Sequence, residues 1–171
     1  MSDVNRFTTK YDLTQDRIQL LVELQDGTVC VLWLTRRLLN YLVPTLFEKL
    51  EAGRRIKDAP SPQAHAVQKF AQAAAVSGLK KQKPVEPPEK IEESRSALVT
   101  AVDLKTSPKA LSLSFKSGQK LVQSLQLTEP VLRQWLEVVQ KQYHAAGWSE
   151  ALWPDWMLTE SQGATQDLRL I

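Results

Sequence analysis

The stretch that decides the fold, residues 30–53, reads CVLWLTRRLLNYLVPTLFEKLEAG. A fully apolar run ends at Leu34, and an amphipathic helical pattern begins immediately after Thr35. The threonine hydroxyl is a good N-cap because it accepts a hydrogen bond from an unpaired amide of the first helical turn. The stretch therefore predicts a strand followed directly by a helix. Pro44 predicts that this helix is kinked or divided near residues 39–43.

The residues before this stretch predict a β-hairpin. Apolar and other residues alternate with a period of two until Asp26-Gly27, the apolar members being Ile18, Leu20, Val22 and Leu24. An Asp-Gly pair between apolar runs favours a hairpin because glycine adopts positive φ at no steric cost. The second strand, residues 29–34, is apolar on both faces and is expected to be central and covered on both sides. An earlier strand is expected over residues 7–13.

The same plan recurs in the C-terminal half of the chain. Alternation over residues 111–116 leads to Ser117-Gly118, a returning strand ends at Leu127, and Thr128 precedes a second amphipathic pattern. The second copy is two residues longer after its turn, which predicts a β-bulge or a longer turn. We therefore predict an α+β fold with an internally duplicated β-β-β-α unit, as an antiparallel sheet or a β-sandwich with packed helices.

Each predicted helix has an apolar face and a glycine near its end. The faces are Leu38, Leu39, Leu42, Leu46 and Leu50 in the first helix, and Leu132, Trp135, Leu136, Val139 and Tyr143 in the second. Gly53 and Gly147 are expected to end the two helices in the left-handed conformation, which glycine adopts readily.

Composition changes divide the chain into four parts. The first β-β-β-α half covers residues 1–53, a basic helical connector with a Pro/Glu/Lys linker covers 54–96, and the second half with a tryptophan-rich segment covers 97–158. The tail covers residues 159–171. We expect the two halves to form one compact domain, since 171 residues suit a single core.

The connector combines a helix with an extended linker. An alanine-rich pattern after Ser61-Pro62 predicts a helix to Leu79. Its apolar face is thin and should hold it weakly; the face consists of Val67, Phe70, Ala71 and Ala74. Residues 84–96 read as an extended, mobile linker because proline, glutamate and lysine offer little apolar area.

No constellation in the sequence supports catalysis. The single cysteine, Cys30, lies in an apolar strand, and His65 and His144 have no partner at metal-ligand spacing. Phosphate-binding and nucleophile-elbow glycine motifs are absent from the sequence. We therefore expect no enzymatic activity, no cofactor and no metal. The sequence also has no apolar run of membrane-spanning length, so we expect no membrane association and a cytoplasmic location.

Three tryptophans gather after the second helix. Trp148, Trp153 and Trp156, with Met157 beside them, bury a large area wherever they dock. One hypothesis is that they close the core, which the rarity of large exposed apolar patches favours. The other is a protein interface, because tryptophan is enriched at interaction hot spots.

Basic clusters raise nucleic-acid binding as an alternative function. They comprise Arg36, Arg37, Arg54, Arg55, Lys57, Lys80, Lys81 and Lys83. Such side chains neutralise phosphates, yet they lack interleaved aromatic residues and a known reading motif. The net charge of the chain is only +3, and basic loops on such a protein are usually solvated surface.

The remaining class is a non-enzymatic protein-interaction module: an adaptor, a scaffold or an oligomeric accessory protein. Its partner would be another protein or a second copy, with a homodimer first because symmetric pairs are the commonest oligomers. Exposed sheet edges, which invite pairing, and the tryptophan segment support this prediction.

Overall fold

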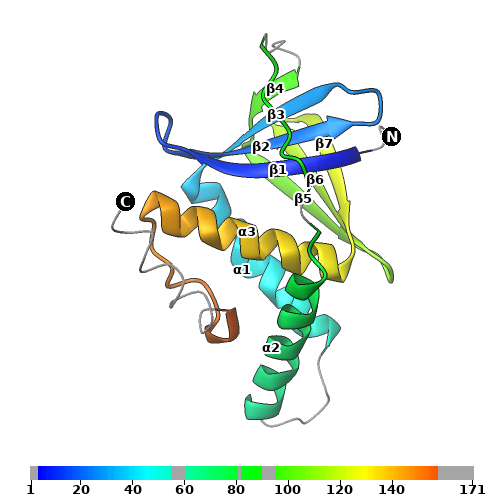
Figure 1. Ribbon diagram of the computed structural model, residues 1–171, viewed down its shortest axis with the longest axis vertical. Coiled ribbons are helices and arrows are strands. Elements are labelled where there is room, and N and C mark those ends of the chain that lie inside the picture. The colour runs from blue at the N-terminus through cyan, green and yellow to red at the C-terminus, as the bar shows by residue number, and fades with distance from the viewer. Residues whose placement is uncertain (1–3, 55–60, 81, 90–94, 158–171) are drawn as a thin grey trace.

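The computed structural model describes residues 4–54, 61–80, 82–89 and 95–157, and shows a mixed α+β fold with two sheets (Figure 1). The first sheet has the strand order β1-β2-β3-β4 and the second the order β5-β6-β7. The strands are β1 Val4–Asp12, β2 Arg17–Leu24, β3 Val29–Leu34, β4 Ser96–Leu98, β5 Ala101–Thr106, β6 Leu111–Ser117 and β7 Lys120–Leu127. The helices are α1 Arg36–Gly53, α2 Ser61–Ser77 and α3 Glu129–Ala146.

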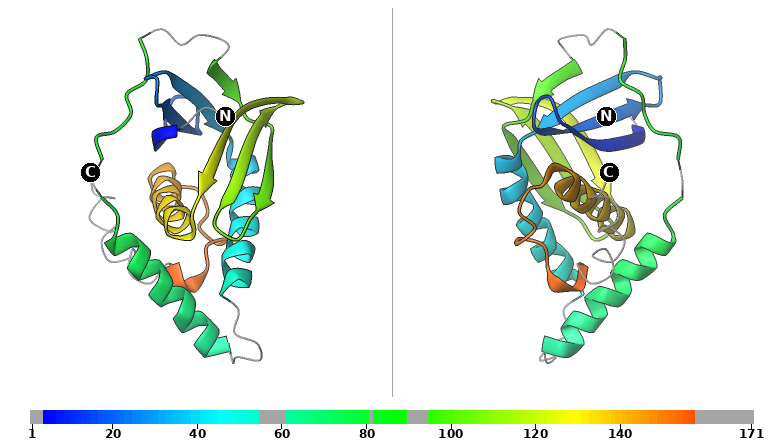
Figure 2. Two further views of the ribbon diagram at one scale, coloured as in Figure 1. Left: turned by 90° about the vertical axis from the view of Figure 1, so that its right-hand side faces the viewer. Right: turned by 60° about the vertical axis from the view of Figure 1, so that its left-hand side comes forward.

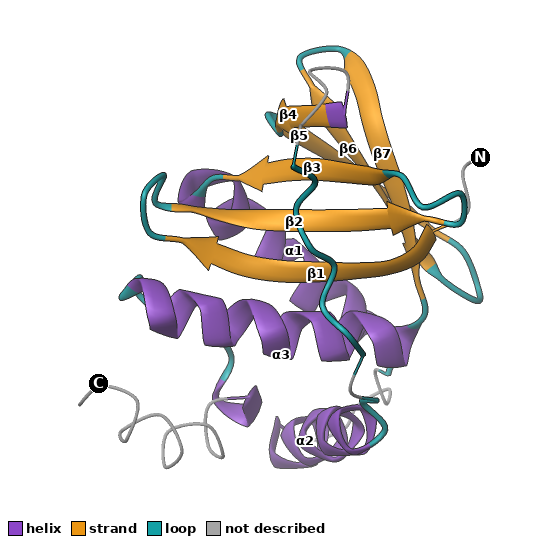
Figure 3. Ribbon diagram, turned by 45° about the horizontal axis from the view of Figure 1, so that its top comes forward, coloured by secondary structure: helices purple, strands orange, loops and turns teal. Residues whose placement is uncertain are grey.

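Both sheets are built around antiparallel meanders. β1, β2 and β3 pair antiparallel, β4 adds to β3 in parallel, and β5, β6 and β7 pair antiparallel. The chain passes between the sheets over two neighbouring residues (Figure 3): the amide of Val99 donates to the Trp33 carbonyl at 3.0 Å, and that of Thr100 donates to the Lys116 carbonyl at 2.8 Å. The connecting residues Val99 and Thr100 therefore bridge the two sheets, one bonding to β3 and the next to β6.

The predicted hairpins are confirmed. Gly27 has φ 86° and Gly118 has φ 63°, the positive values that these turns require. β3 has a strand on each side and buried residues on both faces, as its apolar sequence indicated. The register of β6 with β7 shifts between Phe115 and Lys116, where a bulge or longer turn was expected.

The helix ends agree with the predictions only in part. Thr35 caps α1, its Oγ1 accepting from the Leu38 amide at 3.1 Å, and Gly147 ends α3 with φ 70°. Thr128 occupies the N-cap of α3 but makes no side-chain capping bond. The left-handed end expected at Gly53 is wrong: the helix continues through Gly53 to Arg54, which has φ −121° and donates its amide to the carbonyls of Glu51 and Ala52.

Of the two outcomes predicted at Pro44, a kink or a division of the helix, the division is wrong and the kink stays a prediction. The helix runs from Arg36 to Gly53 with Pro44 inside it. A proline in a helix interior costs about 3 kcal/mol because it removes an amide donor. Burial of a large apolar side chain contributes about 1.5–3 kcal/mol, so the buried face offsets that cost. Its members are Leu39, Leu42, Val43, Leu46, Phe47 and Leu50.

One apolar core contains buried residues of both sheets, α1 and α3, and Figure 2 shows how these elements are arranged around one another. The sheets contribute inward-facing residues of their middle strands and of β7: Ile18, Leu20, Val22, Cys30, Leu32, Leu34, Leu111, Leu113, Phe115, Leu125 and Leu127. All five residues predicted for the apolar face of α3 are buried in this core. Because the core includes residues from both halves of the chain, neither half buries its apolar surface alone.

Helix α3 lies beside the outer edge of β1 and pairs with it through side chains (Figure 1). The Tyr11 amide donates to Gln142 Oε1 at 2.8 Å, and the indole Nε1 of Trp135 donates to Thr9 Oγ1 at 2.9 Å. An unpaired strand edge invites association with another chain. These two bonds, together with the adjacent helix, close that edge of the first sheet.

Residues 82–89, which include the beginning of the predicted linker 84–96, cross the outer face of the first sheet (Figure 3). We call this segment the strap. Val85 is 3% exposed and packs with Leu21 and Val31, and its amide donates to Thr8 Oγ1 at 2.8 Å. The strap is extended, as expected, and one valine anchors it. Residues 90–94 lie outside the described part of the chain, and mobility of residues 84–96 stays a prediction.

Replacing Val85 tests whether the strap is docked in solution. Val85→Ala removes two buried methyl groups, and we expect a loss of about 1–2 kcal/mol in the free energy of unfolding, measured in urea. Glu86→Ala, at the exposed neighbouring position, serves as the control and should change it by less than about 0.5 kcal/mol. Equal stability of wild type and Val85→Ala would show that the strap is not held by this contact.

Candidate functional site

The tryptophan-rich segment lies in the core. Trp148, Trp153, Trp156 and Met157 are all buried. The Phe47 ring makes edge-on contacts with Trp153 and Trp156, each at 5.4 Å between centroids. The three Trp side chains are thus covered within the protomer. Their predicted role at a protein interface concerns an assembly of two chains and stays a prediction. A surface for a partner has to be sought on other elements.

The predicted basic groups do not form one patch in the described residues. Arg36 and Arg37 are exposed at the start of α1, and Arg54 follows its end. The 18-residue helix α1 begins at Arg36 and ends just before Arg54, so these two residues are about 27 Å apart along it at 1.5 Å per residue. Lys80 and Lys83 are exposed after α2. Arg55, Lys57 and Lys81 lie outside the described residues.

Helix α2 turns a polar face inward and an aromatic residue outward. Gln68 and Gln72 are buried together with Ala71 and Ala75, whereas Phe70 is 77% exposed. The apolar face predicted from the sequence is therefore not the face that packs, since of its residues only Ala71 is buried. Figures 1 and 2 show α2 extending away from the sheets, with α3 as the helix it meets.

The polar face of α2 packs inward because α3 offers matching polar groups. Gln72 Nε2 donates to the Arg133 carbonyl at 2.9 Å, Arg133 Nη2 donates to Gln68 Oε1 at 2.7 Å, and Gln134 Nε2 donates to the Ala75 carbonyl at 2.9 Å. Buried side-chain amides require such partners. An α3 surface of apolar residues would instead have favoured the Phe70 side of α2.

Arg133 is the centre of this contact. Its side chain is 1% exposed, its Nε donates to Glu129 Oε1 at 3.1 Å, and its guanidinium lies 5.6 Å from the Trp156 ring centroid. Burial lowers the pKa of Arg133, while the Glu129 carboxylate opposes that shift. Glu129 also accepts from Arg54 Nε. Partial burial acts to raise the pKa of Glu129, but hydrogen bonds from Arg54 and Arg133 lower it overall.

Two polar atoms in the α2–α3 contact have no partner. Arg133 Nη1 and Gln72 Oε1 are buried without a hydrogen bond. A buried unsatisfied group costs about 1–3 kcal/mol. The attachment of α2 is consequently built from alanines and glutamines and is incompletely paired.

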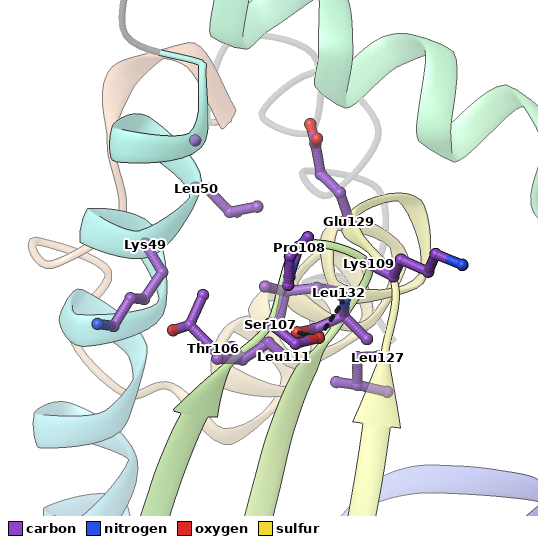
Figure 4. A pocket seen from close by; sticks show the side chains of 12 residues that line it. Lys49, Leu50, Thr106, Ser107, Pro108, Lys109, Leu111, Leu127, Glu129 and Leu132 are labelled. Carbon is purple, nitrogen blue, oxygen red and sulfur yellow. Dashed lines mark hydrogen bonds between the residues drawn. The ribbon is translucent and has the colours of Figure 1, made fainter.

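A groove of about 190 Å³ lies between α2 and the first turn of α3. We call it the α2–α3 groove; its lining residues are Arg54, Phe70, Ala71, Ala74, Ala75, Glu129, Pro130 and Arg133. A second hollow of about 140 Å³ adjoins it between the end of α1 and the β5–β6 turn. Figure 4 shows Glu129 reaching from this second hollow toward α2, so the same carboxylate borders both.

The surroundings of the side chains in the described part of the chain determine which of them could ligate a metal or act as nucleophiles. No group of three His, Cys, Asp or Glu side chains within them is placed to hold a metal ion. Burial raises the pKa of the Cys30 thiol to about 11, which makes it a poor nucleophile. His144 Nδ1 lies 3.3 Å from Glu150 Oε2 in an isolated pair. None of the described helices has the length and apolar character needed to cross a bilayer.

Comparison of the chain with protein-family models, with curated proteins and with solved structures found no match. The α2–α3 groove is the candidate site that the geometry of the described residues supports best. Sequence inspection missed it because α2 alone does not reveal which of its faces would be covered. The sequence signal that could have indicated the buried face of α2 was the pair Gln68 and Gln72, spaced four residues apart and each next to or near an alanine.

Acid titration tests the cluster of Arg54, Glu129 and Arg133. Glu129→Gln removes the anion between two cations, and at about pH 7 we expect a loss of about 1–2 kcal/mol in unfolding free energy, since hydrogen bonds to charged groups contribute on this scale. The pKa of Glu129 is lower in the folded than in the unfolded protein. Its contribution is thus present above the usual value of 4.5 and lost as pH falls through the folded pKa.

The difference between wild type and Glu129→Gln should therefore shrink as the solution is acidified below the usual carboxyl range. Glu48→Gln, an exposed position on α1, is the control and should leave the stability unchanged across the titration. A wild-type advantage over Glu129→Gln that stays constant into strong acid would contradict the ionic account of this cluster.

Proposed function

We propose that the protein is a non-enzymatic protein-interaction module, an adaptor, scaffold or oligomeric accessory protein, which binds through the exposed face of α2. The observation that supports this best is the orientation of that helix. Phe70 is 77% exposed beside a groove, while Gln68 and Gln72 are buried. The exposed Phe70 ring adds no burial energy to the isolated protein, whereas a partner covering Phe70 would gain from its burial.

The gain is substantial for a single residue. Fully burying a phenylalanine side chain contributes about 1.5–3 kcal/mol relative to leaving it exposed. Rotating α2 to bury Phe70 within the protomer would break the bonds of Gln68 and Gln72 to α3. The free energy of burying Phe70 can therefore stabilise a complex with a partner, but it does not stabilise the protomer.

A homodimer is the first form we propose, because symmetric pairs are the commonest oligomers. Within the described residues β4 and β7 each have a strand on one side only, and Leu98 and Leu121 on them are exposed. These edges are further places for association. The buried, unpaired Cys30 suits a reducing compartment, and we propose the cytoplasm.

We also propose that the two halves derive from one duplicated β-β-β-α unit. Support comes from the two antiparallel meanders, β1-β2-β3 and β5-β6-β7, each followed by a helix with a threonine at its N-cap. β4 has no counterpart in the second sheet. A duplicated fold of this kind does not by itself define a function.

Nucleic-acid binding is the alternative and has less support. Arg36 and Arg37 lie at the opposite end of α1 from Arg54. Arg54 itself is engaged by Glu129. Without a continuous basic surface, phosphate contacts would be few.

Substituting the exposed aromatic residue of α2 tests the proposal. Light scattering and sedimentation velocity at micromolar concentration should show a wild-type dimer. Phe70→Ser should weaken the association by about tenfold or more, as expected for an interface hot spot. The control is Tyr41→Ser, which alters an aromatic residue 72% exposed on α1 and should leave the association intact.

The far-UV circular dichroism spectrum should be the same for all three proteins, since neither substituted side chain is buried within the protomer. A dimer equally stable in Phe70→Ser would place the interface away from α2. A wild type that stays monomeric would exclude the homodimer and leave a different protein as the partner.

A further inference from the structure

We propose that the α2–α3 groove binds an acidic peptide segment of a partner protein, one that carries a large apolar side chain between its carboxylates. This inference rests on the proposed function and specifies the chemistry of a partner that is a different protein rather than a second copy. The apolar side chain would lie against Phe70 and Pro130, and a carboxylate beside it would meet Arg54 and Arg133.

The size and lining of the groove favour a single side chain over a cofactor. Its volume is about 190 Å³, smaller than the roughly 300–1,000 Å³ typical of small-molecule sites. Its apolar wall combines one exposed aromatic ring with small residues, which are Ala71, Ala74, Ala75 and Pro130. Small residues beside an exposed ring leave room for one inserted apolar group.

The charge around the groove favours an acidic occupant. Between residues 54 and 83, every charged side chain in the described part of the chain is basic: Arg54, Lys69, Lys80 and Lys83. Inside the groove two arginines flank one carboxylate, Glu129, so the site keeps a net positive charge. Complementary charge favours an acidic segment and opposes a basic one.

The unpaired guanidinium nitrogen supplies an independent reason for a ligand carboxylate. Arg133 lines the groove, and its Nη1 is buried without a hydrogen-bond partner. Hydrogen bonds from a guanidinium to a carboxylate are stronger than those between neutral groups. Because Nε and Nη2 already bond to Glu129 and Gln68, Nη1 can make one such bond to a ligand. Arg54 is half-exposed at the rim and can receive the same carboxylate or a neighbouring one.

Reaching Nη1 requires a small displacement of α2, because this nitrogen is covered in the unbound protein. The attachment of α2 permits that displacement, since its buried face is made of alanines and glutamines with one glutamine oxygen unpaired. The partner carboxylate would then pair the nitrogen that the fold leaves unpaired.

Selection from a phage-displayed library of random dodecapeptides tests the proposal on the full-length protein. Enriched peptides should carry Asp or Glu flanking an aromatic or large aliphatic residue. Fluorescence anisotropy of the best synthetic peptide should show affinity lowered about tenfold or more by Phe70→Ser and by Arg54→Gln. Arg37→Gln, an exposed arginine at the other end of α1, is the matched control and should bind as wild type does.

Replacing the carboxylates of that peptide by amides should weaken binding to the level seen with Arg54→Gln. Enrichment of basic or uncharged peptides that still need Phe70 would overturn the acidic partner but keep the proposed function. Absence of any Phe70-dependent peptide, with a Phe70-dependent dimer, would make a second copy the occupant and overturn this inference alone. If neither peptide nor dimer depends on Phe70, both proposals fall. The acidic-peptide inference would also be overturned if single-stranded RNA bound more tightly than the peptide and this RNA binding depended on Arg54.

Discussion

The hydrogen bonds from α3 to the edge of β1 position the rest of the structure. Gln142 Oε1 accepts a hydrogen bond from the Tyr11 amide, and Trp135 Nε1 donates one to Thr9 Oγ1. These two bonds place α3 along the sheet, with its apolar face in the common core. One consequence is that the opposite side of α3 is polar and presents Arg133 and Gln134 to α2. A second is that the segment after Gly147 returns over the core, where Trp153 and Trp156 surround Phe47.

Because α3 meets α2 with polar groups, α2 has to turn its glutamines inward. Phe70 is then exposed, and the α2–α3 groove forms next to it. The same contact leaves Arg133 Nη1 without a partner in a site flanked by positive charge. Packing, polar pairing and charge therefore combine at one place on the surface, and that place is where we propose that a partner protein binds.

Local features of the fold were predictable from the sequence, and features that depend on a facing surface were not. The turns at Gly27 and Gly118 and the cap at Thr35 follow from residues within a few positions, and the structure has them all. The inward face of α2 depends on what α3 presents, so the apolar residues of α2 were a misleading guide. Likewise, no residue near Val85 in the sequence indicates that its side chain packs against Leu21 and Val31. Gly53 failed as a left-handed end because the helix continues for one residue more.

Native-state hydrogen exchange of the backbone amides tests the central claim, that α2 is held by an incompletely paired polar face. Amides of α2 should exchange through local opening at a free energy well below that of global unfolding, whereas central amides of α3 should approach the global value. Adding denaturant should leave the opening of α2 nearly unchanged until global unfolding begins. Protection of α2 equal to that of α3 would contradict the account, because it would show a helix fixed to the core as firmly as the helix it packs against.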